Sequence, residues 1–255
     1  MIFAICNQKG GVGKTTTAIN LAGYWADAGH SVLLVDMDSQ AHATKGLGIE
    51  ELPEGVQTTL RILVHKQKPT PVIAADNLNI WPGASDMADL ESLIGDRPGK
   101  FHKLKEALTT WAKDYEIVVI DCPPNLGIQS LNALSAADFL IIPSAPGYFS
   151  IDGMANLLNT VDEVTQYTNP ELELLGIVLT HADERTNLTK ETVAFLKEGF
   201  GLQFFEAIIP SAVVLGEAPG QGQTILQYKP DSKAANAYKR LSEEVLSLAR
   251  EKTSS

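Results

Sequence analysis

The sequence has little cysteine, no excess of basic residues and no long apolar run. Its two cysteines, Cys6 and Cys122, are too few for a disulfide scaffold and lack the CxxC spacing of a zinc or iron–sulfur site. With 20 basic and 31 acidic residues, the formal net charge of −11 argues against a protein that coats nucleic acid through bulk charge. No basic segment precedes the first apolar run and no long apolar segment is present, so a secretory signal and a transmembrane span are not expected. We therefore expect a soluble, cytoplasmic protein.

Short apolar runs alternate with helical patterns along almost the whole chain. The runs predict strands at residues 2–6, 32–35, 78–81, 117–120, 139–142, 174–180 and 207–209. Apolar residues at helical spacing predict helices at residues 18–28, 101–111, 151–167, 188–200 and 232–250. This alternation favours an α/β fold, with a doubly wound, mostly parallel sheet and helices on both faces. Because no linker is long enough to divide the chain, we expect a single domain over residues 1–255.

A glycine-rich loop lies between the first predicted strand and the first predicted helix. Its sequence is Lys9-Gly10-Gly11-Val12-Gly13-Lys14-Thr15-Thr16. Glycines let backbone N–H groups converge on an anion, and the following helix adds the positive end of its dipole. In such a loop Lys14 reaches the β- and γ-phosphates of a nucleotide, and the Thr15 hydroxyl ligates Mg²⁺. The general pattern has glycine where this chain has Gln8, and a second lysine, Lys9, stands at the front; the alternative is a glycine-rich turn without a ligand.

Two predicted strands end in carboxylates, one at Asp36 with Asp38 two residues later, and the other at Asp121. In a doubly wound sheet, ligands bind beyond the carboxyl ends of the strands. We therefore expect Asp121 to hold the water shell of Mg²⁺. Asp38 is expected to face the γ-phosphate, where it can orient or activate water. The alternative for each residue is an acid that ends a strand and caps the next turn.

Three segments together resemble the motifs of ParA-type ATPases. They are the loop at 9–16, the stretch Val-Asp-Met-Asp-Ser-Gln-Ala-His-Ala-Thr at 35–44 and Ile-Asp-Cys-Pro-Pro at 120–124, which are similar to the deviant Walker A, switch I and Walker B/switch II motifs. Segments 131–138, 185–188, 217–219 and 228–233 also resemble the chromosomal Soj subgroup. The resemblance covers nearly the whole chain. It implies a P-loop NTPase fold of the deviant Walker A type and hydrolysis of ATP to ADP and phosphate, with weak basal activity.

The resemblance also implies a cycle that uses ATP and Mg²⁺. ATP binding would form a sandwich homodimer in which Lys9 of one subunit reaches the phosphates bound by the other, as an arginine finger does. Lys9, Lys14 and Asp38 would be the catalytic residues, and Thr15, Asp38 and Asp121 the metal-binding residues. The implied nucleotide-binding residues are Lys9, Gly10, Gly11, Val12, Gly13, Lys14, Thr15, Thr16, Asp121, Thr180 and Pro210. His181 is a further candidate for contact with adenine, with a solvated loop histidine as the alternative.

The implied partners are non-specific duplex DNA and an adaptor of the ParB kind that triggers hydrolysis and release. The protein would then be cytoplasmic, and associated with the nucleoid while it holds ATP. Close relatives carry arginines in segment 209–217, where this chain has Ser211 and Val214. The remaining candidates for DNA contact are Arg185, Lys229, Lys233, Lys239 and Arg240, followed by Lys190 and Lys197; the alternative is a solvated helix face. Any DNA binding should be weak in the monomer and strongly dependent on salt.

Three other functions fit parts of this pattern. A ParA-like protein can position a protein cargo over the nucleoid, such as a carboxysome or a chemoreceptor cluster, with the same chemistry and a different adaptor. A membrane-cycling regulator like MinD would need a basic amphipathic tail. Residues 241–255 contain three glutamates and no aromatic anchor, so no stable membrane association is expected. A nitrogenase-reductase-like cluster carrier would need cysteine ligands that the chain lacks.

Overall fold

A sheet of seven strands forms the centre of the computed structural model, which describes residues 1–147 and 149–254. The strands are β1 (Ile2–Ile5), β2 (Val32–Asp36), β3 (Val72–Ala75), β4 (Leu78–Trp81), β5 (Ile117–Asp121), β6 (Phe139–Ser144) and β7 (Glu173–Leu179). Their order is β3-β4-β2-β5-β1-β6-β7. The β3–β4 pair is antiparallel and the other pairs are parallel. The predicted sheet type is therefore confirmed.

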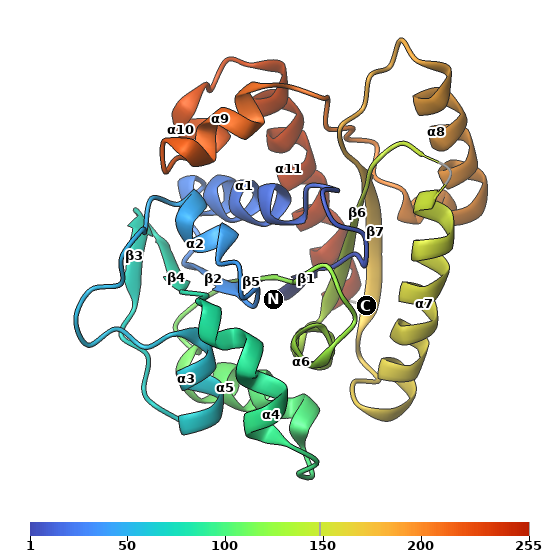
Figure 1. Cartoon of the computed structure of the whole chain (residues 1–255). Helices are drawn as coiled ribbons and strands as arrows, with labels where there is room; N and C mark the ends of the chain where they lie inside the picture. The colour runs from blue at the N-terminus through green and yellow to red at the C-terminus, as the bar shows by residue number, and fades with distance from the viewer. Residues whose placement is uncertain (148, 255) are drawn as a thin grey trace.

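Helices cover both faces of the sheet (Figure 1). One face carries α1 (Lys14–Asp27), α2 (His42–Gly46), α9 (Val214–Gly220), α10 (Ile225–Tyr228) and α11 (Lys233–Thr253). The other carries α3 (Thr59–His65), α4 (Leu90–Ile94), α5 (Lys103–Trp111), α6 (Ile128–Ala136), α7 (Phe149–Tyr167) and α8 (Asn187–Phe200). In the described part of the chain, none of these helices combines the length and the apolar character needed to cross a membrane.

Every strand except the edge strand β3 contributes side chains to two hydrophobic clusters, because successive side chains point to opposite faces. In β1, Phe3 and Ile5 pack under α1 and α11, whereas Ala4 packs toward α5 and α6. Strands buried on both faces read as continuous apolar runs. That is why the runs in the sequence located β1, β2, β5 and β6 to within two residues of their ends.

The strand predicted at 207–209 is wrong. The segment runs beside β7, where the Ile209 amide donates to the Leu179 carbonyl at 2.8 Å. It pairs there only through isolated bridges, Ile177 with Phe204 and Ala182 with Pro210, among the residues described. The amides of Glu206 and Ala207 donate instead to the Glu244 carboxylate on α11, at 2.8 and 3.1 Å, so they are not available to a regular ladder.

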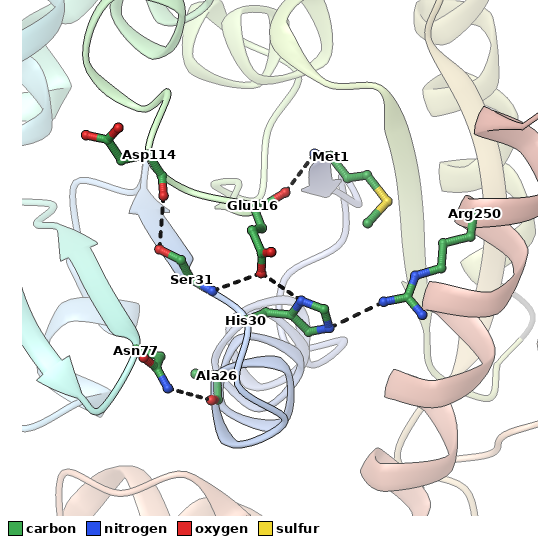
Figure 2. A network of polar contacts seen from close by, with 8 residues as sticks. All are labelled: Met1, Ala26, His30, Ser31, Asn77, Asp114, Glu116 and Arg250. Carbon is green, nitrogen blue, oxygen red and sulfur yellow. Dashed lines mark hydrogen bonds and ion pairs between the residues drawn. The ribbon is translucent and has the colours of Figure 1, made fainter.

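A polar network joins the amino-terminal edge of the sheet to the last helix (Figure 2). The Met1 ammonium donates to the Glu116 carbonyl at 2.9 Å. His30 Nδ1 lies 2.9 Å from the Glu116 carboxylate, and His30 Nε2 lies 3.4 Å from an Arg250 guanidinium nitrogen on α11. The hydrogen bond from His30 holds the pKa of Glu116 below its usual value. This network ties α1, β5 and α11 together at the edge opposite the carboxyl ends of the strands.

Candidate active site

The glycine-rich loop leaves β1 and enters α1 through two left-handed glycines. Gly11 has φ 70° and Gly13 has φ 78°, values that glycine adopts at no steric cost. Gly13 is the N-cap of α1, and its carbonyl accepts the Thr17 amide at 2.8 Å. The first amides of a helix have no partner within the helix. The loop and the start of α1 therefore present backbone donors to an anion.

The two lysines of the loop lie in different surroundings. Lys14 is buried, with 7% of its surface exposed, and its ammonium donates to the Lys9 carbonyl at 2.9 Å. Burial lowers the pKa of Lys14, and the nearby Asp121 carboxylate opposes that shift. The Lys9 side chain is exposed, while its amide is fixed by the Asn7 side chain at 3.0 Å. The two positive charges are thus separated, one buried in the site and one at the surface.

The carboxylates meet because of the strand register. Asp36 on β2 pairs with Asp121 on β5, so both side chains lie at the carboxyl edge of the sheet. Asp36 is fully buried and accepts the Thr44 amide at 2.9 Å, the Thr44 hydroxyl at 2.7 Å and the Asp38 amide at 3.0 Å. Asp36 therefore holds the chain that carries Asp38, which is a structural role that the sequence did not distinguish from a ligand role.

Asp121 is the carboxylate whose oxygens lack hydrogen-bond partners among the described residues. The residue is fully buried. Burial, followed by the charge of Asp36, raises its pKa, while the Thr15 hydroxyl and the Lys14 ammonium oppose the rise. Buried polar atoms in native proteins are normally paired. An unpaired carboxylate beside a hydroxyl and a phosphate loop therefore fits a hydrated Mg²⁺.

No group of three or more His, Cys, Asp or Glu side chains in the described chain is arranged as a complete metal cage. Mg²⁺ usually keeps several waters and binds through one or two carboxylates together with substrate phosphates. Thr15, Asp38 and Asp121 are a donor set of that kind.

A cavity of about 580 Å³ opens above the loop. It is lined by Gly10, Lys14, Thr15 and Asp38, so the structure brings these predicted residues together. The exposed Lys9 is not among the described residues that line it. The far half of the cavity lies between α1, α2 and α9, which are neighbours in Figure 1.

The walls of that far half were not predicted from the sequence. They are Ile19, His42, Lys45, Gly46, Pro219 and Gly220. Two signals were available, because the segment at 35–44, which resembles switch I, contributes His42 and the segment at 217–219, which resembles the Soj subgroup, contributes Pro219. Beside this wall, a Cβ on Gly222 would come within 2.6 Å of the Gly48 Cα, so two backbones touch directly.

A second cavity of about 320 Å³ lies on the other side of Gly13 and Thr16. Thr180 lines it, and its hydroxyl donates to the Val12 carbonyl at 2.9 Å. His181, at φ 51°, lies at its rim, with Nε2 3.5 Å from the position of a Cβ on Gly13. Thr180 and His181, two of the residues predicted to contact adenine, thus line one cavity, while Pro210 lines the next groove.

That neighbouring groove, of about 750 Å³, brings together three of the candidate DNA contacts, Arg185, Lys233 and Arg240. Arg185 is paired with Asp183 through two bonds of 2.9 and 2.8 Å. Lys229 and Lys239 are exposed, but lie outside the described residues that line the groove. The five candidates are therefore only partly brought together.

Relatives of known sequence match this chain over nearly its whole length. A family model described as an AAA domain matches residues 1–174. The sporulation initiation inhibitor protein Soj of Bacillus subtilis is 40% identical over 247 residues, which cover 96% of this chain and 97% of that protein. The chain belongs to the Soj/ParA family. The chromosome-partitioning ATPase Soj of Thermus thermophilus is 42% identical over 249 residues, 98% of this chain and 96% of that protein.

As a member of the Soj/ParA family, the protein is a P-loop ATPase. The crystal structure of cobyrinic acid a,c-diamide synthase from Mycobacterium smegmatis with bound ADP and magnesium is also similar. It superposes with a TM-score of 0.84 at 30% identity, covering 98% of this chain and 95% of that one. The similarity confirms the predicted fold class.

Proposed function

We propose that this Soj/ParA ATPase forms an ATP-dependent sandwich dimer that binds duplex DNA without sequence preference and partitions a plasmid or chromosome. A ParB-like adaptor stimulates hydrolysis and so releases the dimer from the nucleoid. The observation that carries this proposal is the separation of the two lysines. Lys14 is buried and lines the phosphate cavity, whereas the exposed Lys9 is not among the described residues that line it, which leaves Lys9 available to a second subunit.

The proposed ligand of the two cavities is ATP with Mg²⁺. The loop amides from Gly10 to Thr16 and the Lys14 ammonium hold the phosphates. Thr180, with Pro210 beyond it, lies toward the base. Thr15, Asp38 and Asp121 hold the metal and its waters, and Mg²⁺ supplies charge that stabilises the phosphate oxygens. The unpaired oxygens of Asp121 support this assignment.

Hydrolysis then depends on two side chains that flank the terminal phosphate. Asp38 orients the attacking water, and its position is fixed because Asp36 accepts the Asp38 amide. The partner subunit's Lys9 adds positive charge at the γ-phosphate, so the reaction requires the dimer. This arrangement couples nucleotide turnover to assembly.

The proposal is tested by measuring binding to non-specific duplex DNA with ATP, with ADP and without nucleotide, over a series of salt concentrations. We expect binding with ATP that weakens steeply as salt rises, because counterions are released from the phosphates. Absence of binding in every state, despite ATP-dependent dimerisation, would remove DNA from the proposal. Binding of the ATP-bound dimer to anionic lipid vesicles and to a candidate adaptor protein would then be tested in place of DNA binding.

A further inference from the structure

Lys45 is a second lysine in the phosphate cavity to which the proposed function gives no role. It lies in the last turn of α2, and its side chain is exposed and lines the same cavity as Lys14 and Asp38. Its ammonium donates to the Gln40 carbonyl at 3.0 Å. Because that acceptor is neutral, the hydrogen bond leaves the charge of Lys45 uncompensated. No carboxylate in the described chain forms an ion pair with it.

A short closed turn connects Lys45 to Asp38. The Gln40 amide donates to the Asp38 carboxylate at 2.9 Å. The Ala41 amide donates to the Asp38 carbonyl at 3.0 Å, and the Lys45 amide donates to the Ala41 carbonyl at 3.0 Å. Ala41 completes this turn in a left-handed conformation, with φ 55°. The ammonium of Lys45 is therefore hydrogen-bonded to Gln40, a residue of the same turn that positions Asp38.

The charge of a bound triphosphate would favour a second cation in the cavity besides Lys14. A triphosphate carries one more phosphate, and therefore more negative charge, than a diphosphate. Among the described lining residues, Lys14 and Lys45 are the two lysines, and Asp38 is the one carboxylate. Lysine has a flexible stem of four carbons and a compact charge that can move between acceptors. An ionised phosphate oxygen is a stronger acceptor than a neutral carbonyl.

We infer that Lys45 is a terminal-phosphate sensor that acts within its own subunit. When ATP binds, its ammonium leaves the Gln40 carbonyl and pairs with an oxygen of the γ-phosphate. With ADP, it stays on the carbonyl. The inference rests on the proposed function, because it requires the nucleotide to occupy this cavity. It differs from the role of Lys9, which requires a second subunit, since Lys45 would distinguish ATP from ADP in the monomer.

The test is equilibrium binding of ADP and of a non-hydrolysable ATP analogue, each with Mg²⁺, at protein concentrations below dimerisation. Lys45→Met keeps the stem and removes the charge, Lys45→Arg keeps the charge, and Lys68→Met, in the loop after α3, is a matched exposed control. We expect Lys45→Met to lower the affinity for the ATP analogue roughly tenfold or more, because one charge-assisted hydrogen bond to the ligand is lost. The affinity for ADP should change by less than about twofold. In the ADP state the substitution removes only the hydrogen bond from Lys45 to the Gln40 carbonyl, and ADP makes no contact with Lys45.

Recovery of the analogue affinity in Lys45→Arg, together with no effect of Lys68→Met, would support the sensor. An equal loss of affinity for both nucleotides would overturn it, because Lys45 would then only stabilise α2. Thermal unfolding would measure that loss of stability. Unchanged affinity for both nucleotides would also overturn it, leaving a solvated lysine. Failure of the unsubstituted protein to bind either nucleotide would instead refute the nucleotide site itself, and the sensor with it.

Discussion

Asp38 illustrates how a single carboxylate is prepared for chemistry by its neighbours. It is 7% exposed, its amide is fixed by Asp36 and its side chain accepts the Gln40 amide. The side chain is thus held in one orientation before any ligand binds. Groups fixed in this way can orient water without further reorganisation.

Removing this carboxylate should separate binding from hydrolysis. We expect Asp38→Asn to retain ATP binding, to accumulate the ATP-bound dimer and to lower turnover by roughly 10²- to 10⁴-fold, the usual contribution of a positioned acid or base. Phosphate release and light scattering would measure the two effects. Asp76→Asn, in an exposed turn, is the control. Undiminished turnover in Asp38→Asn would exclude Asp38 from the mechanism.

Asp183 provides a pH-dependent prediction at the edge of the proposed DNA groove. Its hydrogen bonds with the Arg185 side chain and then with the Arg185 amide lower its pKa to about 2. Because the folded pKa lies below the unfolded value of about 3.9, the pair stabilises the fold above that pH. The stabilisation is lost as the pH falls toward 2. The Arg185 side chain is 90% exposed and the Asp183 side chain 38% exposed, so solvent screens the pair and its contribution should be small.

In Arg185→Ala, the pKa of Asp183 should rise toward its ordinary value, and carboxyl NMR titration of the two proteins would measure it. An unchanged pKa would show that the pair does not form in solution. The pairing also bears on DNA binding, because a phosphate that recruits Arg185 must first displace Asp183.

At the scale of elements, the interior of the sheet is where the sequence was most informative. Strands such as β2 and β5 are buried on both faces, so burial imposes a continuous apolar run that can be read directly. Apart from the run at 78–81, the short pieces between residues 44 and 100 gave no such signal. α3 and α4 are seven and five residues long, and their positions depend on contacts with α5 and α6 rather than on their own periodicity.

The site likewise has a part that local sequence patterns predict and a part that depends on tertiary packing. The phosphate loop and the strand-end carboxylates are local patterns, and the register of β2 and β5 brings Asp36 and Asp121 together as the topology predicts. The walls contributed by α2 and α9 come from segments far apart in the chain and depend on tertiary packing. The roles of Lys9, Thr180 and the C-terminal basic residues stay predictions, as does the single domain.

A packing contact between β7 and the segment after α8 gives a stability prediction. A Cβ on Gly176 would lie 2.6 Å from the Phe205 ring, which is buried. Gly176→Ala should therefore cost about 1–3 kcal/mol through overpacking. Gly199→Ala, in α8 with no atom within 4 Å of the new Cβ, should be neutral or slightly stabilising. Urea unfolding of both variants would measure the difference, and equal stabilities would contradict the packing assignment.

At the scale of the whole molecule, assembly should depend on Lys9. We expect Lys9→Ala to abolish the ATP-dependent dimer and to retain nucleotide binding, because Lys14 and the loop amides remain in place. Lys68→Ala, an exposed lysine in the loop after α3, is the control. Light scattering with and without ATP is the measurement. A normal ATP-dependent dimer in Lys9→Ala would show that Lys9 does not act across the interface.

The contact between Gly48 and Gly222 has a consequence for small-molecule inhibitors. The two backbones touch without an intervening side chain, beside the wall that α2 and α9 contribute to the phosphate cavity. Neither glycine is among the described residues that line the cavity, but with no side chain to rotate, their contact fixes how closely the chain after α2 approaches the chain after α9. A competitor that extends beyond the phosphates would therefore meet walls whose separation this backbone contact sets, and its shape would matter more than its flexibility.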